Sequence, residues 1–201
     1  MLFRSWPPSK LGRYISRNEQ VMRFLVLLLL AFNCYADDLT AKAWLIADEN
    51  GKIIVGEHEQ SVRPIASITK LITAITVLES GANMSEDIVT QEFGSISRAE
   101  LLDMAIVRSN NQAAMLLCST YPRGYKMCIK DMNDKLQSLG MVHSKVYEPT
   151  GLDPRNKSSA EELIKLVKEA SRYPEIIGAS SKSGVEVKIR KKWRSEEHTS
   201  E

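Results

Sequence analysis

The sequence predicts an α+β fold in which an antiparallel sheet is flanked by helices. Two short β-rich stretches come first, a long run of helical segments follows, and another β-rich stretch lies at 185–189. Strands grouped at the two ends of a helical run favour an antiparallel sheet over the regular strand–helix alternation of a parallel one. With 201 residues, the chain is long enough for one domain with a sizeable core.

The first 36 residues are expected to precede this domain. Residues 22–36 combine a basic start, an apolar run at 24–32 and small residues just before Asp37, which is the pattern of a cleaved signal peptide. A membrane-anchoring helix is the alternative, but the apolar run is too short to span a bilayer. We interpret residues 1–21 as a translation start assigned too far upstream, and we expect no stable membrane span after cleavage.

The charge balance changes once this segment is removed. The whole chain carries 27 basic and 25 acidic residues, and residues 1–36 hold five of the basic ones and one of the acidic ones. The remaining chain has 22 basic and 24 acidic residues, a net charge of −2. Because phosphate binding needs a concentrated basic surface, we do not expect nucleic acid as a partner.

Two cysteines, Cys118 and Cys128, remain after signal cleavage. In an oxidising compartment they could pair across the turn at 121–124. The alternative is that they are two small buried residues on neighbouring helices. The sequence leaves both possibilities open.

The first β-rich stretches predict a hairpin. They lie at 43–47 and 53–55, and the Asp-Glu-Asn-Gly sequence at 48–51 between them favours a tight turn. An almost entirely apolar segment at 64–78 then predicts a buried helix that ends near Ser80 and Gly81.

A second helix is marked by its cap. Ser97 and Glu100 form a capping-box pattern ahead of an apolar stretch at 101–107. Residues 108–110 interrupt the helical pattern, which resumes at 112–118.

Two more helices are expected in the second half of the chain. Residues 124–139 are amphipathic and stop at Gly140. A rigid loop at 148–154 follows. The next helix is capped by the pair Ser158 and Glu161 and ends near Ala170.

Lys70 is the single charged residue of the apolar segment at 64–78. Burying a lone ammonium is costly unless it finds a partner or loses its proton. Ser67 lies three residues earlier, a spacing that places both side chains on one helix face. A buried lysine with a lowered pKa can act as a base, and a serine beside it becomes an activated nucleophile. Ser67 and Lys70 are therefore the first candidate catalytic residues.

A second candidate element is Ser109-Asn110-Asn111, which falls in the break between two helical segments. The Ser109 hydroxyl could relay a proton, and the Asn111 amide could hold a peptide carbonyl. Serine and asparagine also cap helices routinely, and the triplet by itself favours that structural role. Its chemical interpretation depends on the first motif.

Together, the two motifs resemble the signature of the penicillin-recognising serine enzymes, which joins Ser-x-x-Lys, Ser-x-Asn and Lys-Thr/Ser-Gly. The flanking sequences look like those of the D-Ala-D-Ala carboxypeptidase family, and within it like the D-alanyl-D-alanine endopeptidase branch of low-molecular-mass penicillin-binding proteins. The similarity covers about residues 43–177 and is carried by the segments at 65–71, 109–114, 121–125, 139–141 and 148–152. It implies a β-lactamase/transpeptidase-like fold and a serine peptidase of the bacterial periplasm.

The resemblance implies a role for each matching residue. Ser67 would attack the carbonyl of the penultimate D-Ala and form an acyl-enzyme, and Lys70 would take its proton. Ser109 would pass a proton to the leaving amine, and Asn111 would orient the substrate backbone and Lys70. The expected partners are peptidoglycan stem peptides, with β-lactams as inhibitors.

The resemblance implies neither a metal nor a cofactor. The three histidines lie far apart in the sequence and form no ligand pair at helical spacing. We interpret His58, His143 and His198 as surface residues.

The family's third motif has one candidate, Lys182-Ser183-Gly184. It follows the preceding helix too closely, because the family has tens of residues more before this motif, and we interpret it as a coincidental match on a solvated strand edge. Residues 194–201 are polar and aperiodic, and we interpret them as a foreign or disordered tail. The resemblance then implies a serine peptidase domain at 37–193 that is incomplete at its C-terminus.

Three other interpretations stay open. A serine β-lactamase needs a base that hydrolyses the acyl-enzyme, and Glu148 and Glu161 are available, although neither lies in the expected Glu-x-x-Leu-Asn setting. A truncated chain that binds cell-wall peptide or β-lactam weakly, or is catalytically inert, is the second. An unrelated periplasmic α+β binding protein is the third, and it would leave Lys70 unexplained.

Overall fold

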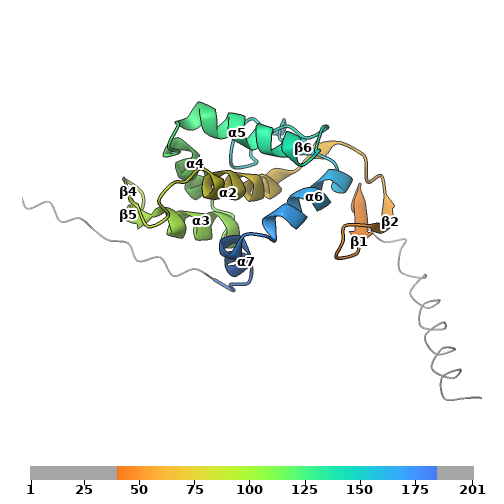
Figure 1. Cartoon of the computed structure of the whole chain (residues 1–201), viewed down its shortest axis with the longest axis horizontal. Coiled ribbons are helices and arrows are strands. Elements are labelled where there is room, and N and C mark those ends of the chain that lie inside the picture. Colours follow the sequence, from red (N-terminus) through yellow and green to blue (C-terminus); the bar gives the residue numbers. More distant parts are fainter. Residues whose placement is uncertain (1–39, 185–201) are drawn as a thin grey trace, which may run out of the picture. The chain divides into compact units, whose positions relative to one another are not determined.

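The computed structural model describes residues 40–184, which form helices and small antiparallel sheets (Figure 1). This arrangement confirms the α+β prediction for the described part of the chain. The described strands form three separate two-stranded sheets. The strand expected at 185–189 and the tail at 194–201 lie outside the described residues, as do the expected signal peptide and its upstream extension.

The predicted hairpin is present. Strands β1 (Trp44–Ala47) and β2 (Ile53–Glu57) pair antiparallel, with Trp44 opposite Glu57. The turn between them is stabilised by Asp48, whose carboxylate accepts the backbone N–H groups of Asn50 and Lys52 at 2.9 Å each. This local side-chain bonding is the usual reason for aspartate at the start of a turn.

The other two sheets join more distant segments. Strands β4 (Asp87–Thr90) and β5 (Gly94–Ser97) form a short hairpin that the sequence analysis did not predict. Strands β3 (Arg63–Pro64) and β6 (Lys157–Ser158) pair across more than 90 residues of sequence. The pairing of β3 with β6 brings the loop that precedes β6 next to the start of the apolar helix.

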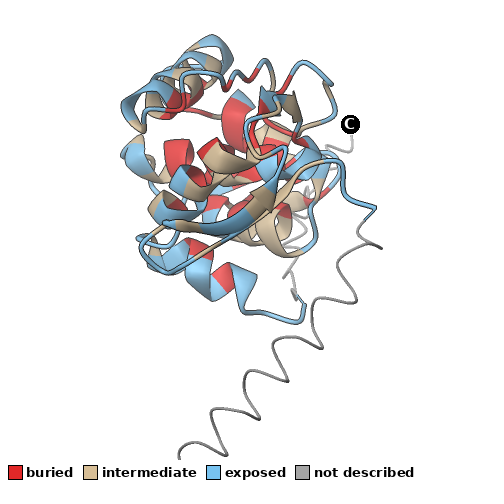
Figure 2. Ribbon diagram, turned by 90° about the vertical axis from the view of Figure 1, so that its right-hand side faces the viewer, coloured by how far each residue is buried: buried red, intermediate tan, exposed pale blue. Residues whose placement is uncertain are grey.

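The helices pack around α2. Helix α2 contacts α3, α4, α5 and α6, which surround it in Figure 1. Its apolar side chains include Ile72, Ile75 and Val77, all fully buried, and Figure 2 shows that buried residues gather on the inner helices. The helices are η2 (Ala66–Ile68, a 3-10 turn), α2 (Thr69–Glu79), α3 (Arg98–Val107), α4 (Asn111–Ser119), α5 (Tyr125–Ser138), α6 (Ala160–Ala170) and α7 (Pro174–Ser180).

The predicted helix caps are partly correct. The capping box of Ser97 and Glu100 is present at the start of α3, with both reciprocal hydrogen bonds formed. The predicted cap of α6 is wrong by one residue, because Ser159 and not Ser158 accepts the backbone N–H of Glu162. Ser158 is extended in β6 and its hydroxyl bonds to Ser144, so the side chain is not free to cap the helix.

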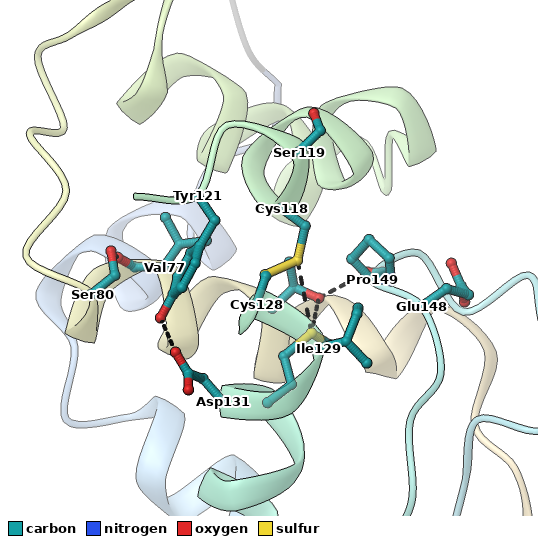
Figure 3. Close-up of a disulfide and its surroundings, with 12 residues drawn as sticks. Val77, Ser80, Cys118, Ser119, Tyr121, Cys128, Ile129, Asp131, Glu148 and Pro149 are labelled. Carbon is teal, nitrogen blue, oxygen red and sulfur yellow. Dashed lines mark hydrogen bonds between the residues drawn. A yellow bond between two sulfur atoms is a disulfide. The ribbon is translucent and has the colours of Figure 1, made fainter. Parts of the chain in front are cut away.

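Cys118 and Cys128 form a disulfide between α4 and α5 (Figure 3). Their Cα atoms are 5.6 Å apart, and both residues are fully buried. The structure therefore selects the first of the two possibilities that the sequence left open. The bond ties the C-terminal end of α4 to the first turn of α5.

No helix within residues 40–184 is long and apolar enough to cross a membrane.

Candidate active site

Three of the predicted site residues meet at one point. The ammonium Nζ of Lys70 donates to the hydroxyl Oγ of Ser67 at 3.1 Å, and the hydroxyl of Ser109 donates to the same Oγ at 2.9 Å. Ser109 lies 42 residues after Ser67, so only the packing of α3 and α4 against α2 brings them together. The Ser67 hydroxyl thus has a potential base on one side and a second hydroxyl on the other.

Ser67 lies in the 3-10 turn η2 and not in the α-helix that the sequence predicted from residue 64. The α-helix begins at Thr69, and Ala66 takes a left-handed backbone conformation with a φ of 45°. Such a conformation is uncommon for a residue with a side chain and is often found at functional sites. The tight turn leaves Ser67 exposed while Lys70, one turn further, is buried.

Ser109 and Asn110 make different contacts: Asn110 caps a helix, and Ser109 contacts Ser67. Asn110 is the N-cap of α4, and its side-chain oxygen accepts the backbone N–H of Ala113 at 2.8 Å. Ser109, with a φ of 51°, lies in the break between α3 and α4, and its hydroxyl turns to Ser67. The capping interpretation is therefore confirmed for Asn110, whereas the chemical role of Ser109 remains a prediction that its contact with Ser67 supports.

Lys70 is 2% exposed. Besides Ser67, its ammonium donates to the backbone carbonyl of Thr150 at 2.7 Å. Burial lowers the pKa of Lys70 below its ordinary value, and the negative charge of Glu148 partly opposes this effect. A lysine with a lowered pKa loses its proton more readily, so Lys70 is suited to accept the proton of Ser67.

The loop at 148–153 completes the site, and its contact with Lys70 was missed by the sequence analysis. Thr73, one turn after Lys70 on α2, donates its hydroxyl to the carbonyl of Pro149 at 2.8 Å. Two successive carbonyls of the loop are therefore bound to one face of α2. A backbone acceptor cannot be recognised from residue types. The Pro-Thr-Gly sequence at 149–151 predicted a rigid loop and contributed to the family resemblance, but it did not predict this contact.

Both carboxylate oxygens of Glu148 are occupied by hydrogen bonds from its own surroundings. Its carboxylate accepts hydrogen bonds from Thr150, Gly151 and Asn156, all within or just after its own loop. Burial raises the pKa of Glu148, but the hydrogen bonds together outweigh burial and hold the pKa below its ordinary value. A base that activates water at the acyl-enzyme needs a free carboxylate oxygen close to Ser67, so this geometry does not favour Glu148 in the β-lactamase role.

Asn111 and Lys182 form no hydrogen bond with Ser67 or Lys70 among the bonds found within residues 40–184. Asn111 is the exposed first residue of α4. Lys182 follows α7 and not a strand, and it forms an ion pair with Asp103 at 2.6 Å. The role of Asn111 in orienting the substrate remains a prediction.

The histidines that the structure describes lie at the surface. His58 and His143 are 67% and 70% exposed at their side chains, and His143 contacts the buried Glu162 at 3.1 Å. Within residues 40–184, no group of three or more His, Cys, Asp or Glu side chains is arranged to hold a metal ion. His198 lies outside the described residues.

Sequence comparison relates this site to a family of peptidases. The family profile described as D-alanyl-D-alanine carboxypeptidase, peptidase S11, matches residues 31–91 and 80–199. The chain is 39% identical over 160 residues to a D-alanyl-D-alanine endopeptidase of Escherichia coli, covering 72% of this chain and 51% of that protein. It is 36% identical over 153 residues to a D-alanyl-D-alanine endopeptidase of Pseudomonas aeruginosa, covering 68% and 49%.

Solved structures show the same fold. A D-alanyl-D-alanine carboxypeptidase from Mycobacterium tuberculosis superposes with a TM-score of 0.65 at 23% identity, covering 71% of this chain and 60% of that one. Penicillin-binding protein D2 from Listeria monocytogenes, in its cefotaxime-bound form, superposes with a TM-score of 0.60 at 26% identity, covering 67% and 63%. The chain spans about half the length of the curated relatives it matches.

Proposed function

The chain belongs to the D-alanyl-D-alanine carboxypeptidase family, and from this premise we propose that it is a serine-type D-Ala-D-Ala peptidase acting through an acyl-enzyme on Ser67. One observation carries the proposal. The Ser67 hydroxyl accepts hydrogen bonds from a buried lysine and from a second serine, Ser109. When Lys70 is neutral, its amine can accept the Ser67 proton across the same contact, which is the arrangement required for nucleophilic catalysis.

In the first half of the proposed reaction, Ser67 Oγ attacks the carbonyl carbon of the penultimate D-Ala while its proton passes to neutral Lys70. The carbonyl oxygen becomes an oxyanion, to which the backbone N–H of Ser67 would donate. When the intermediate collapses, the carbon–nitrogen bond breaks. The leaving amine takes a proton that the Lys70 ammonium supplies through the Ser109 hydroxyl, whose oxygen lies 2.9 Å from Ser67 Oγ.

In the second half, water attacks the ester carbonyl. The bond between the acyl carbon and Ser67 Oγ breaks, and Ser67 recovers a proton. Lys70 and Ser109 are the described groups within hydrogen-bond reach of Ser67 Oγ, so they are the candidates to move this proton as well. Asn111 would hold the substrate backbone in both halves, in keeping with the family motif.

We propose peptidoglycan stem peptides as substrates and β-lactams as inhibitors. Support comes from the relatives, which include D-alanyl-D-alanine endopeptidases and structures of a penicillin-binding protein with cefotaxime and with ampicillin bound. The endopeptidase names favour cleavage of cross-links over trimming of free D-Ala ends. The periplasm, which follows from the expected signal peptide, is the proposed compartment.

Benzylpenicillin labelling of the full chain tests the proposal. We expect one penicilloyl adduct in the intact mass of the wild type and none in Ser67→Ala. Ser119→Ala, a change of an exposed serine on α4, is the matched control and should keep the adduct. A folded wild-type chain that gains no adduct, or an adduct on Ser67→Ala, would contradict the proposal.

The lifetime of the adduct separates the proposed peptidase from a β-lactamase. A peptidase of this family should hold the penicilloyl group for much longer than its peptide acyl group, and should cleave a peptide cross-link formed through D-Ala. Rapid, repeated penicillin hydrolysis without peptide cleavage would instead favour the β-lactamase alternative. Cooperative thermal unfolding of each variant checks that the chain under test is folded.

A further inference from the structure

Glu148 is the centre of the hydrogen bonds that shape the loop beside the active site. One carboxylate oxygen accepts the backbone N–H of Thr150 at 2.7 Å and the Thr150 hydroxyl at 2.6 Å. The other accepts the backbone N–H of Gly151 at 2.6 Å and the side-chain amide of Asn156 at 2.9 Å. Both oxygens of one partly buried carboxylate are therefore used to hold a single turn of backbone.

This turn carries the carbonyl that binds Lys70. The amide nitrogen and the carbonyl oxygen of Thr150 belong to one residue, and they bond to Glu148 and Lys70 respectively. The Thr150 carbonyl also shares its planar peptide bond with the Gly151 N–H, which donates to Glu148 as well, and this charge-assisted hydrogen bond limits the orientations open to the carbonyl. The position of the Lys70 ammonium relative to Ser67 Oγ thus depends on a contact that Glu148 organises.

Asn156 ties the same carboxylate to α2. Its side chain is fully buried and donates to Glu148, to the Glu148 carbonyl at 2.9 Å and to the Thr69 hydroxyl at 3.3 Å. Its backbone carbonyl accepts the N–H of Ile65, two residues before Ser67. Glu148 is therefore bonded, through one residue, to both sides of the turn that carries the nucleophile.

The charge of Glu148 also reaches Lys70. Among the described residues, Glu148 is the charged group whose field acts on the Lys70 ammonium, and it opposes the effect of burial on the lysine pKa. Glu148 also acts on Tyr125, the first residue of α5. Burial raises the pKa of Tyr125, and the negative charge of Glu148 raises it further. The hydrogen bonds to Glu148 lower its own pKa, so it is ionised at neutral pH.

We propose that Glu148 is a positioning residue for the acylation step. Its carboxylate orients the Thr150 carbonyl toward Lys70, and this contact holds the lysine Nζ within hydrogen-bond distance of Ser67 Oγ. The inference rests on the proposed function, in which Lys70 is the base. Glu148 itself neither touches the substrate nor exchanges a proton in this scheme. Its effect is exerted through Thr150 and through its charge.

Two substitutions separate the effect that Glu148 exerts through Thr150 from the effect of its charge. Glu148→Gln keeps the length of the side chain but removes the charge and brings an NH2 group against backbone donors. Glu148→Asp keeps the charge but is one methylene too short to reach all of the hydrogen-bond donors around Glu148. The matched control is Glu162→Gln, which neutralises another carboxylate that is hydrogen-bonded and 4% exposed but does not act on Lys70.

Benzylpenicillin acylation rates are measured from neutral to alkaline pH for the full chain and each variant. Displacement of a catalytic group by about 1 Å can cost about 100-fold in rate, and we expect losses of about 10- to 100-fold at the pH optimum for both Glu148 variants. The midpoint of the pH profile should move to lower pH in Glu148→Gln, because the charge that favours the Lys70 ammonium is gone, and should stay near the wild-type value in Glu148→Asp. Glu162→Gln should match the wild type in both quantities.

A titration of Lys70 by NMR gives a readout that does not require activity. The side chain is assigned in lysine-labelled protein by comparison with Lys70→Arg, and its pKa should be lower in Glu148→Gln than in the wild type and in Glu162→Gln. An unchanged Lys70 titration together with wild-type acylation in Glu148→Gln would overturn the inference. Absence of acylation in the wild type would instead contradict the proposed function. The inference on Glu148 would then be tested by the Lys70 titration alone, and an unchanged Lys70 pKa in Glu148→Gln would overturn it.

Discussion

Gly151 lies against the carbonyl of Ala66, so closely that a Cβ atom on residue 151 would be 1.9 Å from that oxygen. The same atom would be 3.0 Å from the backbone nitrogen of Ser67. Gly151 also has a φ of 89°, in the left-handed region that favours glycine. The loop can therefore approach the turn of the nucleophile only because residue 151 has no side chain.

Gly151→Ala should push the loop away from Ser67. The clash is with backbone atoms, which cannot rotate aside, so either the 148–153 loop or the turn at 66–68 must move. We expect the acylation rate to fall by about 100-fold, since the Thr150 carbonyl moves with the loop. The measurement is the rate of penicilloyl adduct formation, with thermal unfolding to record the loss of stability.

Gly81→Ala separates this effect from backbone strain. Gly81 has a φ of 74°, and a Cβ atom there would meet nothing within 4 Å. The substitution should cost about 1–2 kcal/mol of stability, the usual cost of a left-handed alanine, and leave acylation unchanged. Equal acylation losses in the two variants would show that the contact between Gly151 and Ala66 has no special importance.

The acylation rate should rise with pH as Lys70 loses its proton. Because burial lowers the pKa of Lys70, the midpoint should lie below the ordinary lysine value of about 10.4. Unfolding restores the ordinary pKa, so the unfolded state binds more protons between these two values and the protein becomes more stable as pH rises through this window. Stopped-flow acylation and urea unfolding at a series of pH values measure the two effects.

Lys70→Arg tests whether loss of a proton is required. Arginine keeps the positive charge and can still donate hydrogen bonds, but it stays protonated throughout the accessible range. We expect acylation to fall by about 100- to 10,000-fold, the usual contribution of a general base, with no recovery at alkaline pH. An arginine variant that reacts at the wild-type rate would exclude Lys70 as the base.

Lys182→Ala should leave acylation unchanged. The Lys182 ammonium is paired with Asp103 on α3, and this pair is partly exposed, so its loss should cost no more than about 1 kcal/mol of stability. Asp103→Asn breaks the same ion pair from the other side and is the matched control. If Lys182→Ala loses acylation while Asp103→Asn does not, Lys182-Ser183-Gly184 must be reconsidered as the third motif of the family.

Removal of the disulfide should lower stability more than activity. The bond between Cys118 and Cys128 closes a loop with a sequence separation of 10, and loss of such a cross-link typically costs about 2–4 kcal/mol. Urea unfolding with and without reductant measures this difference. The double variant Cys118→Ala/Cys128→Ala should unfold at the reduced protein's midpoint and should not respond to reductant, whereas identical midpoints for the oxidised and reduced wild type would contradict the expectation.

The sequence by itself determined the features that depend on neighbouring residues. The hairpin at β1 and β2, the capping box of Ser97 and the pairing of Ser67 with Lys70 each follow from side chains within a few positions of one another. Such local interactions can be recognised in the sequence, because strands, helix caps and side-chain pairs on one helical turn each place particular residue types at fixed spacings. Where two neighbouring residues fit the same pattern, as Ser158 and Ser159 do, the local rule could not choose.

The tertiary structure decided what bonds to Lys70 and Ser67 from elsewhere in the chain. The Thr150 carbonyl lies 80 residues from Lys70 and is a backbone group, which leaves no trace in the residue types. The orientation of Ser109 and the closure of the Cys118–Cys128 bond likewise depend on how α3, α4 and α5 pack on α2. The packing of these helices depends on many weak contacts between segments that are distant in the sequence. No single stretch of sequence therefore determines the final positions of the helices.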